Sequence, residues 1–431
     1  MWRSLKRISL KLVTRPSLLS LDDALAQLLA VSALARTESV STFDADGRVL
    51  AEDVISELQV PAFDNSSMDG YAVRLADLKH GDGSQATWTL PCRLRVPAGQ
   101  SPSALPEGEV ARIFTGAPIP FGADAVVMQE DCTDLGTADG VPTIRINVLP
   151  AKAQWIRRAG EDVRKGSTVL ACGTRLSPAE LGLAASVGMA NLTVAAKPRV
   201  ALFSTGDELV MPGTVAPADM RAGSIYNSNR FFLRALLNRM GCEVTDLGIV
   251  PDNREATVQA LSHAALRHDL ILTSGGVSVG EEDHIKPAVQ QLGDLNLWQI
   301  AMKPGKPFAF GRIDKTYFVG LPGNPVSSFV TFLLLVRPLL LQLQGTAGMA
   351  LRAMPTPIQL RADFDVTRSD KRREFLRVRK NASGGLDLFP NQSSGVLTSA
   401  VWGDGLVDNA AGQTIKRGDM VSYLSFADFL I

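Results

Sequence analysis

The sequence predicts a multidomain chain that combines one α/β domain with all-β modules. The first observation is the length, since 431 residues correspond to about three domains of ordinary size. The second is that strand-like and helix-like segments alternate between about residues 198 and 343, which indicates an open, mostly parallel sheet covered on both faces. The third is that the flanking stretches carry short β-type runs separated by Gly, Pro and Asp turns.

The composition excludes several classes of protein. Lys plus Arg and Asp plus Glu both number 44, so the chain lacks the basic excess expected of a nucleic-acid-binding protein. Hydrophobic residues make up 45%, which is enough for real cores and argues against disorder. The four cysteines are forty or more residues apart, so we expect neither structural zinc nor a disulfide framework, and we favour a reducing compartment.

The longest apolar run, 332–336, is followed by Arg337 and Pro338 and is too short to span a bilayer. We therefore expect a soluble, intracellular protein without a membrane or nucleic-acid partner. Residues 1–16 are basic and free of acids. A transit peptide can have this composition, but we favour a poorly ordered extension ahead of the first domain.

The elements follow in order along the chain. A helix should begin after Ser20, because Ser20 and Asp23 form a capping-box pattern ahead of regularly spaced leucines. An all-β module is expected next, with strand-like runs at 49–60, 86–96, 110–114, 125–129 and 143–148. Ser177 and Pro178 then suit the start of a second helix, which Gly188 should end.

The α/β domain should contain strands at 199–205, 243–250, 269–273, 297–302 and 316–321, with helices near 232–240 and 258–265 between them. A proline-rich joint at 354–357 separates this region from a small terminal β-domain. Its predicted strands are 358–362, 374–379, 386–389 and 420–426.

Candidate functional residues gather where the predicted parallel strands end. Ligands of open α/β sheets bind beyond these carboxyl ends. The segments found there are polar, glycine-rich or charged: 204–208, Asp252, 273–280 with Asp283, 303–306 and 321–325. Carboxylates can hold Mg²⁺, and lysines with free backbone N–H groups can hold anionic oxygens. The residues alone therefore predict Mg²⁺ and a phosphate-containing ligand at this rim.

Simpler interpretations remain open for several of these segments. Glu281-Glu282 replaces the Lys-Ser/Thr pair of a Walker motif, and no G-x-G-x-x-G occurs, so Gly275 and Gly276 could form a plain tight turn or a phosphate cradle. Asp252 could be a helix N-cap, and the Asp207-Glu208 pair a solvated turn. The four histidines are isolated, which supports neither metal ligation nor a Ser–His nucleophile.

Two other rim segments also begin or flank helices. Asn324 and Pro325 suit an N-cap and a first helical position, although such a helix start can also bind an anion. Lys303 and Lys306 place two ammonium groups on a stiff Pro/Gly loop, where their mutual repulsion favours an anion between them. In the β-module, the loop 61–72 concentrates Asp, Asn and Ser residues, and 113–118 follows later; Asx-turns use the same residue types.

Seven motifs, in this order, resemble those of the MoeA family, which includes the gephyrin E domain. They are Asp64-Asn-Ser-Ser-Met-Asp-Gly-Tyr-Ala72, Thr115-Gly-Ala-Pro118, Gly160-Glu-Asp162, Ser204-Thr-Gly-Asp-Glu-Leu209, Ser274-Gly-Gly-Val-Ser-Val-Gly280, Lys303-Pro-Gly-Lys-Pro-Phe308 and Gly320-Leu-Pro-Gly-Asn-Pro-Val326. The resemblance covers nearly the whole chain from about residue 17.

The resemblance implies a function in molybdenum cofactor biosynthesis. Molybdate is inserted into adenylylated molybdopterin, AMP is released, and Mg²⁺ assists. It also implies a cytoplasmic, elongated homodimer whose further partners are a molybdopterin adenylyltransferase and acceptor molybdoenzymes.

The implied architecture comprises an α/β/α sandwich, an inserted β-module and a small β-barrel-like domain at the C-terminus. The expected divisions are an extension at 1–16, a helix at 17–36 that packs on the α/β domain, a linking and dimerisation subdomain at 37–54 and 150–190, the β-module at 55–149, the molybdopterin-binding α/β domain at 191–345 and the C-terminal domain at 346–431.

The resemblance also implies a set of site residues. The catalytic candidates are Asp69, Thr115, Glu208, Asp252, Asp283 and Lys303, with Asp252 and Asp283 as the Mg²⁺ ligands. The substrate-binding candidates are Ser274, Gly275, Gly276, Ser278, Lys306, Pro322, Gly323, Asn324, Arg377 and Ser394. Gln299, Asn227 and Ser393 depart from the family pattern, which puts an anion contact, a metal role and the C-terminal assignment in doubt.

Two alternative functions stay open. The α/β domain also resembles molybdopterin adenylyltransferase, although that enzyme lacks the β-module and the C-terminal domain. A non-catalytic scaffold of the same fold is the other alternative, and the retained Asp69, Asp283 and Lys303 argue against it.

Overall fold

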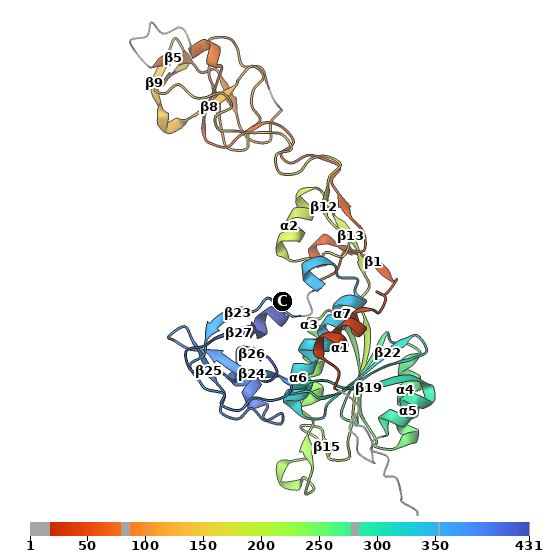
Figure 1. Cartoon of the computed structure of the whole chain (residues 1–431). Coiled ribbons are helices and arrows are strands. Elements are labelled where there is room, and N and C mark those ends of the chain that lie inside the picture. Colours follow the sequence, from red (N-terminus) through yellow and green to blue (C-terminus); the bar gives the residue numbers. More distant parts are fainter. Residues whose placement is uncertain (1–17, 79–86, 102, 277–283, 352–353, 431) are drawn as a thin grey trace, which may run out of the picture.

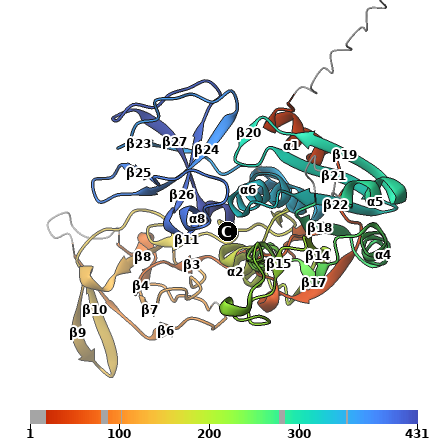
Figure 2. The ribbon, with the colours of Figure 1, turned by 90° about the horizontal axis from the view of Figure 1, so that it is seen from below.

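The computed structural model describes residues 18–78, 87–101, 103–276, 284–351 and 354–430. Figure 1 shows an elongated molecule with a β-module at one end and the α/β domain at the other. A narrow linking subdomain joins them, and the C-terminal β-domain lies beside the α/β domain, as the views in Figures 1 and 2 agree. The predicted combination of one α/β domain with β-modules is confirmed.

The α/β domain is built on a six-stranded sheet in the order β17-β14-β18-β22-β21-β19. Four neighbouring strands are parallel: β17 (Glu243–Val250), β14 (Arg199–Thr205), β18 (Leu270–Ser274) and β22 (Thr316–Leu321). The last two, β21 (Pro307–Ile313) and β19 (Gly293–Gln299), are antiparallel to their neighbours. The strand predicted at 297–302 was misplaced, because β19 ends at Gln299, and β21 was missed because Pro307 and Gly311 interrupt its apolar pattern.

Helices cover both faces of this sheet. Along β14, Val200 and Leu202 point into a core shared with α1 (Leu21–Leu29), α3 (Asn229–Arg239), α6 (Pro325–Thr331) and α7 (Arg337–Leu343). Ala201 and Phe203 point into the other core, shared with α4 (Arg254–Ala265) and α5 (Ile285–Leu292). This alternation is that of a strand buried on both faces. The predicted α/β/α sandwich is confirmed, and residues of α1 share one of its two cores.

One long core helix differs from the expectation. The apolar run 332–336 is part of it: a π-helical segment, η5 (Phe332–Val336), joins α6 to α7, so the helix continues through Arg337 and Pro338 and is longer than the run alone. Pro338 has no N–H to donate, and it directly follows the π-helical segment, where the regular α-helical hydrogen-bond ladder is already interrupted. Among the described residues, 325–343 is the one helix long and apolar enough to cross a membrane, and 89% of its apolar window is buried inside the protein. Its burial is that of a core helix.

The linking subdomain contains two short antiparallel ladders. In one, β1 (Thr37–Ser41) pairs with β13 (Asn191–Ala195), and in the other β2 (Val54–Ile55) pairs with β12 (Thr168–Leu170). Helix α2 (Pro178–Ser186) packs against them. Because β13 pairs with β1, the α/β domain begins at β14, several residues after the predicted boundary at 191. Helix α2 starts as predicted, with the Ser177 N–H donating to the Glu180 carboxylate at 2.9 Å.

The β-module consists of two small sheets packed face to face. The four-stranded sheet has the order β6-β7-β4-β8, with β6 (Leu94–Val96), β7 (Ala111–Ile113), β4 (Gly70–Val73) and β8 (Ala125–Met128). The second has the order β5-β10-β9, with β5 (Trp88–Pro91), β10 (Val141–Ile146) and β9 (Cys132–Ala138). A pair of short strands, β3 (Asn65–Ser66) and β11 (Ile156–Arg157), connects the module to the linking subdomain.

The C-terminal domain contains β23 (Ile358–Arg361), β24 (Arg373–Lys380), β25 (Leu386–Leu388), β26 (Gly405–Asn409) and β27 (Met420–Ser425), with α8 (Thr398–Trp402) and α9 (Phe426–Leu430). The sheet has the order β24-β26-β27-β23, and β25 pairs with the free edge of β24. A bridge between Ala362 and Leu386 links the two ends of this order, which confirms the predicted barrel-like shape. Strand β26 was not predicted.

The α/β domain also contributes one strand to the C-terminal sheet. Strand β20 (Met302–Lys303) leaves the α/β sheet after β19 and pairs in parallel with the start of β24, so that Lys303 lies opposite Glu374. The predicted boundary at residue 346 therefore describes the covalent order of the domains, whereas the C-terminal sheet extends across it.

Candidate functional site

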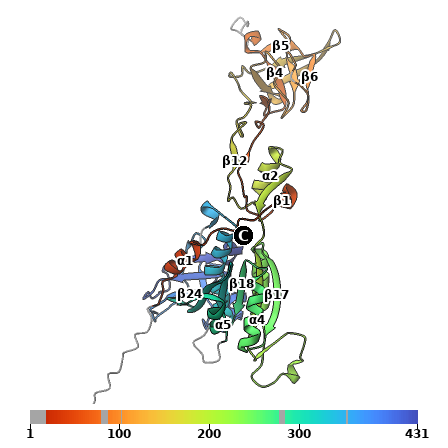
Figure 3. The ribbon, with the colours of Figure 1, turned by 90° about the vertical axis from the view of Figure 1, so that its right-hand side faces the viewer.

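A cleft of about 830 Å³ opens at the carboxyl ends of β14, β18 and β22. Its wall includes β15 (Leu209–Val210) and β16 (Ile225–Tyr226), which lie at the end of the molecule opposite to the β-module (Figures 1 and 3). Gly395 of the C-terminal domain completes the wall. The structure brings the following predicted residues together here: Glu208, Asp252, Ser274, Gly275, Gly276, Pro322, Gly323 and Asn324.

The glycine pair in this cleft is required by the backbone. Gly275 and Gly276 have φ values of +94° and +67°, in the left-handed region that favours glycine. A Cβ on Gly276 would lie 2.5 Å from a side-chain carbon of Ile285 and 2.9 Å from the hydroxyl of Thr205. The tight-turn interpretation is therefore correct as far as the backbone goes, and the same turn also lines the cleft.

A buried amide holds the floor of the cleft together. Asn229, the first residue of α3, donates from Nδ2 to the Ser274 hydroxyl and to the Gly323 carbonyl, both at 2.7 Å. The Ser328 hydroxyl in turn donates to the carbonyl of Pro322 at 3.0 Å. These contacts fix the ends of β18 and β22 relative to the start of α3. The sequence reasoning missed Asn229, although Ser228-Asn229 ahead of a helical pattern, close after a short strand, resembles a helix start.

Asp252 lines the cleft and is not the N-cap of α4. That position belongs to Asn253, whose side chain accepts a hydrogen bond from the backbone N–H of Ala256 at 2.9 Å. The neighbouring asparagine removes the simple structural explanation for Asp252. Ser278 and Asp283 lie outside the described residues, so their predicted roles stay predictions.

The donors in the cleft are suitable for a hard divalent cation. Asp252 and Glu208 supply carboxylates, and the buried Ser204 hydroxyl has no hydrogen-bond partner among the described residues. Mg²⁺ prefers oxygen ligands and usually keeps several waters, so two carboxylates are enough protein ligands. In the described part of the chain, which does not include Asp283, no three His, Cys, Asp or Glu side chains gather in a metal-binding group.

The three departures from the family pattern have different surroundings. Asn227 is buried in the cleft wall, where Oδ1 accepts from the backbone N–H of Arg230 at 3.2 Å and Nδ2 has no described partner. The carbonyl of Gln299 accepts from the N–H of Leu19 at 2.8 Å, which ties the N-terminal segment to the α/β domain. The Ser393 N–H donates to Oδ1 of Asn391 at 3.0 Å and its carbonyl accepts from Arg377 at 3.4 Å, in the loop of the C-terminal domain that reaches the cleft.

Lys303 is not a free anion receptor in this structure. Its ammonium lies 2.9 Å from Oε1 of Glu374 and 3.6 Å from a carboxylate oxygen of Asp370. Glu374 is buried, whereas the Lys303 side chain is 43% exposed. Carboxylates of the C-terminal domain therefore compensate the charge of Lys303 in this structure, and the predicted anion between Lys303 and Lys306 stays a prediction. Lys306 is exposed and has no ion pair with a described carboxylate.

Arg377 does not reach the cleft. It is 1% exposed and donates to the Ser399 hydroxyl at 3.1 Å and to the carbonyl of Ser393 at 3.4 Å. Burial lowers the pKa of this guanidinium to about 10. The expected direct contact of Arg377 with substrate is corrected to a supporting role, since the arginine holds the loop next to Ser394. The Ser394 carbonyl accepts from the N–H of Val326 at 2.9 Å, which fastens this loop beside Gly395 at the cleft wall.

Asp69 and Thr115, predicted from separate motifs, form one pair in the β-module. The carboxylate oxygen Oδ1 of Asp69 accepts from the backbone N–H of Thr115 at 2.7 Å and from its hydroxyl at 2.8 Å. These hydrogen bonds, the backbone one first, lower the pKa of Asp69 below its usual value. Both residues are exposed, at the end of the molecule opposite to the cleft (Figure 1).

Comparison with known proteins accounts for this arrangement. Three family models match successive parts of the chain: the MoeA N-terminal region (domain I and II) at residues 19–188, a probable molybdopterin binding domain at 201–342 and the MoeA C-terminal region (domain IV) at 359–426. A molybdopterin molybdenumtransferase of Haemophilus influenzae is 46% identical over 330 residues, which are 76% of this chain and 78% of the relative. The chain belongs to the MoeA family.

Other MoeA relatives extend the match over most of the chain. A molybdopterin molybdenumtransferase of a Nostoc species is 34% identical over 387 residues, covering 88% of this chain and 86% of the relative. A crystal structure of a MoeA protein from Pyrococcus horikoshii has a TM-score of 0.74 at 31% identity, covering 95% of this chain and 99% of that one. A second MoeA structure from Pyrococcus horikoshii has a TM-score of 0.80 at 27% identity, with 95% and 100% covered.

Proposed function

We propose that this chain inserts molybdate into adenylylated molybdopterin and releases AMP, as a Mg²⁺-dependent homodimer. Membership of the MoeA family makes it a transferase of molybdenum cofactor biosynthesis that acts with molybdopterin. The adenylylated form of the substrate, the dependence on Mg²⁺ and the dimer are the parts we propose. The observation that carries the proposal is the cleft at the rim of the molybdopterin-binding domain, where the predicted residues converge.

The chain's own residues would bind and orient an anionic substrate in this cleft. The Gly275-Gly276 turn exposes backbone at the cleft wall, and the Asn229 amide fixes that turn against the loop at Gly323. Positioning of this kind is most of what a protein contributes to cleavage of a phosphoanhydride, since little covalent help from side chains is needed. The Ser394–Gly395 loop brings the C-terminal domain to the same wall.

Asp252 and Glu208 are the described residues that would hold Mg²⁺, with Asp283 as the further ligand expected from the sequence. The cation supplies positive charge that neutralises phosphate oxygens during cleavage. Without it, the carboxylates of Asp252 and Glu208 would repel an anionic substrate. We therefore expect substrate binding itself, and not only turnover, to need the divalent cation.

The dimer is proposed because Asp69 and Thr115 lie far from the cleft of their own chain (Figure 1). The hydrogen bonds from Thr115 keep Asp69 ionised and pointed outward on an exposed loop, which suits contact with another molecule. In a two-fold dimer each β-module could reach the cleft of the partner, so that each site draws on both chains. A cytoplasmic location and the partner enzymes named above stay predictions.

The two alternative functions, adenylyltransferase and scaffold, would each leave some domains or polar residues of this chain without a role. An adenylyltransferase of molybdopterin would need only the α/β domain, yet matches to the MoeA N-terminal and C-terminal regions flank it. A scaffold would not need the polar network of Asn229 and Ser274 or the ionised Asp69.

The test supplies purified protein with adenylylated molybdopterin, molybdate and Mg²⁺ and measures AMP together with molybdenum cofactor. Release of AMP with cofactor formation, both lost when Mg²⁺ is chelated, is the expected result. Formation of adenylylated molybdopterin from molybdopterin and ATP would instead identify an adenylyltransferase. Absence of both reactions, with the protein folded, would leave the scaffold.

A further inference from the structure

A pair of arginines in the β-module lies outside the cleft described above. Arg95 on β6 and Arg112 on β7 are register partners in neighbouring parallel strands, so their side chains leave the same face of the sheet side by side. Tyr71 on β4 is the next residue in the same row, opposite Arg112. Like charges that lie directly beside each other on a sheet destabilise it unless something compensates them.

The described carboxylates provide no direct ion pair for these two arginines. Neither Arg95 nor Arg112 forms an ion pair with any described Asp or Glu, whereas Arg93, two residues before Arg95, pairs with Glu109. Asp134 lines the same cavity, and the charge of Arg112 contributes to the lowered pKa of Asp69, but neither carboxylate forms an ion pair with the two guanidinium groups. Like-charged arginines without acidic partners are typical of a site that receives an anion.

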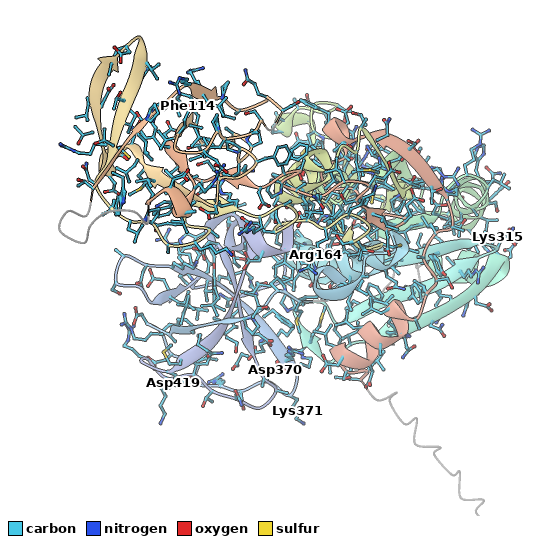
Figure 4. All side chains as sticks on the ribbon, turned by 90° about the horizontal axis from the view of Figure 1, so that it is seen from above. Phe114, Arg164, Lys315, Asp370, Lys371 and Asp419 are labelled. Carbon is cyan, nitrogen blue, oxygen red and sulfur yellow. The ribbon has the colours of Figure 1, made fainter. Side chains whose placement is uncertain are left out.

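An aromatic ring holds the two guanidinium groups in place. The central carbon of the Arg95 guanidinium lies 4.6 Å from the centre of the Phe114 ring, and that of Arg112 lies 4.8 Å from the same centre. Figure 4 shows Phe114 on the β-module. A guanidinium that lies over a ring can still donate hydrogen bonds to a ligand from the N–H groups at its edge.

Hydrogen bonds fix Arg112 further. It donates to the Gly70 carbonyl at 3.2 Å and to the side-chain oxygen of Gln129 at 2.7 Å. Arg95 is exposed and donates to no acceptor in the part of the chain that the structure describes. One arginine is therefore preorganised, and the other remains free to close on a ligand.

Both arginines line a cavity of about 530 Å³ between the two sheets of the β-module. Its wall also includes Tyr71, Arg93 and one carboxylate, Asp134. The cavity is near the Asp69–Thr115 pair, because Asp69 directly precedes β4 and Thr115 follows Phe114. A group bound in this cavity would therefore lie near the Asp69–Thr115 pair.

We infer that Arg95 and Arg112, stacked on Phe114, form an oxyanion site in the β-module. Its ligand is a tetrahedral oxyanion, either a phosphate group of the substrate or molybdate. This rests on the proposed function only for the identity of the substrate, since the arginines themselves define the charge and shape of the ligand. Planar guanidinium groups that bind phosphate through paired N–H donors are a common form of such recognition.

The test follows modification of Arg95 by phenylglyoxal, with peptide mass spectrometry to measure each arginine separately. Inorganic phosphate, AMP and molybdate are each added to the whole protein. Arg164, an exposed arginine outside the β-module that Figure 4 labels, serves as the internal control. We expect the anion to slow modification of Arg95 several-fold and to leave Arg164 unchanged.

The three anions distinguish the source of the ligand. Protection by phosphate and AMP but not by molybdate identifies the phosphate group, and the reverse pattern identifies molybdate; protection by all three supports an oxyanion site without further selectivity. If none of them protects Arg95 at millimolar concentration, the inference is overturned.

Calorimetric titration of variants provides the second measurement. Loss of one charge-assisted hydrogen-bonding group weakens affinity by about tenfold or more, so Arg95→Ala should show this loss at the β-module site, with partial recovery in Arg95→Lys. Arg145→Ala is the matched control, because Arg145 lies in the same module but hydrogen-bonds to Asn147 and Thr133 and does not line the cavity. Equal affinities of Arg95→Ala and the wild type would contradict the inference.

The outcome is separable from that of the proposed function. Anion protection of Arg95 needs no molybdenum insertion, so it can be found even if the protein releases no AMP. Conversely, AMP release with unprotected Arg95 would leave the proposed function intact and remove the oxyanion site.

Discussion

Replacing Lys303 with alanine should destabilise the joint between the α/β and C-terminal domains. The Lys303 ammonium lies 2.9 Å from Oε1 of Glu374, and the other carboxylate oxygen of Glu374 is buried without a described partner. Truncation of the lysine leaves a buried carboxylate with its compensating charge removed. This is the situation in which losing one partner costs more than the pair contributes.

The size of the effect follows from exposure. A fully buried pair loses about 3–5 kcal/mol when one partner is removed. The Lys303 side chain is 43% exposed, so water already weakens its interaction, and Asp370 is 3.6 Å away as a second, more exposed partner. We therefore expect a loss of about 1–3 kcal/mol, near the cost of one unsatisfied buried acceptor. At about 2–4 °C for each kcal/mol, the melting temperature should fall by about 2–12 °C.

Thermal unfolding followed by circular dichroism measures this change. Lys306→Ala is the matched control, because Lys306 is exposed on the same loop and has no described ion pair. The double variant Lys303→Ala/Glu374→Gln removes the buried charge as well and should regain most of the stability. A melting temperature for Lys303→Ala equal to that of the wild type would refute the reasoning.

The same variants separate the two possible roles of Lys303. If the lysine also binds a substrate anion, the double variant should be stable and still inactive. If activity returns together with stability, the lysine acts through the domain joint, and the sequence-based assignment of Lys303 as a catalytic residue is wrong.

Three further predictions follow from the geometry. Co-refolded Asp69→Asn and Asp252→Asn proteins should recover about one quarter of wild-type activity, since half of randomly formed dimers are mixed and each has one intact shared site; tagged mixed dimers without activity would exclude a shared site. Gly276→Ala should lower the free energy of unfolding in urea by about 1–3 kcal/mol, because its Cβ would clash at positive φ. The control Gly182→Ala lies in a helix with nothing within 4 Å of its Cβ and should raise that free energy by about 0.5–1 kcal/mol. Thr115→Val should raise the pKa of Asp69 toward its ordinary value, so that the carboxylate protonates at higher pH in an NMR titration; an unchanged titration would show that the backbone N–H alone sets it.

Much of the architecture was predictable because local signals and tertiary packing agree. β14, β17 and β22 have the predicted bounds; β14 and β22 are largely buried runs, and β17 alternates exposed with half-buried residues. The capping residue Ser20 holds its helix start as expected, with the Asp23 N–H donating to its hydroxyl at 3.0 Å. The rim segments converge because parallel strands end at one edge of the sheet.

The failures at Lys303 and Arg377 share a physical cause, which is partners distant in sequence, whereas the choice of N-cap was a local ambiguity. The sequence around Lys303 does not predict its contact with Glu374, because the two residues meet through strand pairing between domains. Arg377 resembles a surface arginine in sequence, yet its strand turns it into the core of the C-terminal domain. Asp252 and Asn253 are both good N-caps by type, and only the hydrogen bond to Ala256 decides between them.

The pairing of β20 with β24 has a consequence for dissecting the protein. A fragment ending before the C-terminal domain would keep Met302–Lys303 without its strand partner, and the separate C-terminal fragment would expose the edge of β24 that β20 normally covers. An uncovered strand edge is a template for pairing with other chains. Fragments cut at the covalent boundary should therefore self-associate, and a cleaner separation would transfer a short surrogate strand to the C-terminal piece. Loss of the C-terminal domain in evolution would likewise leave β20 without a partner, so the remaining chain would have to cover that strand in another way.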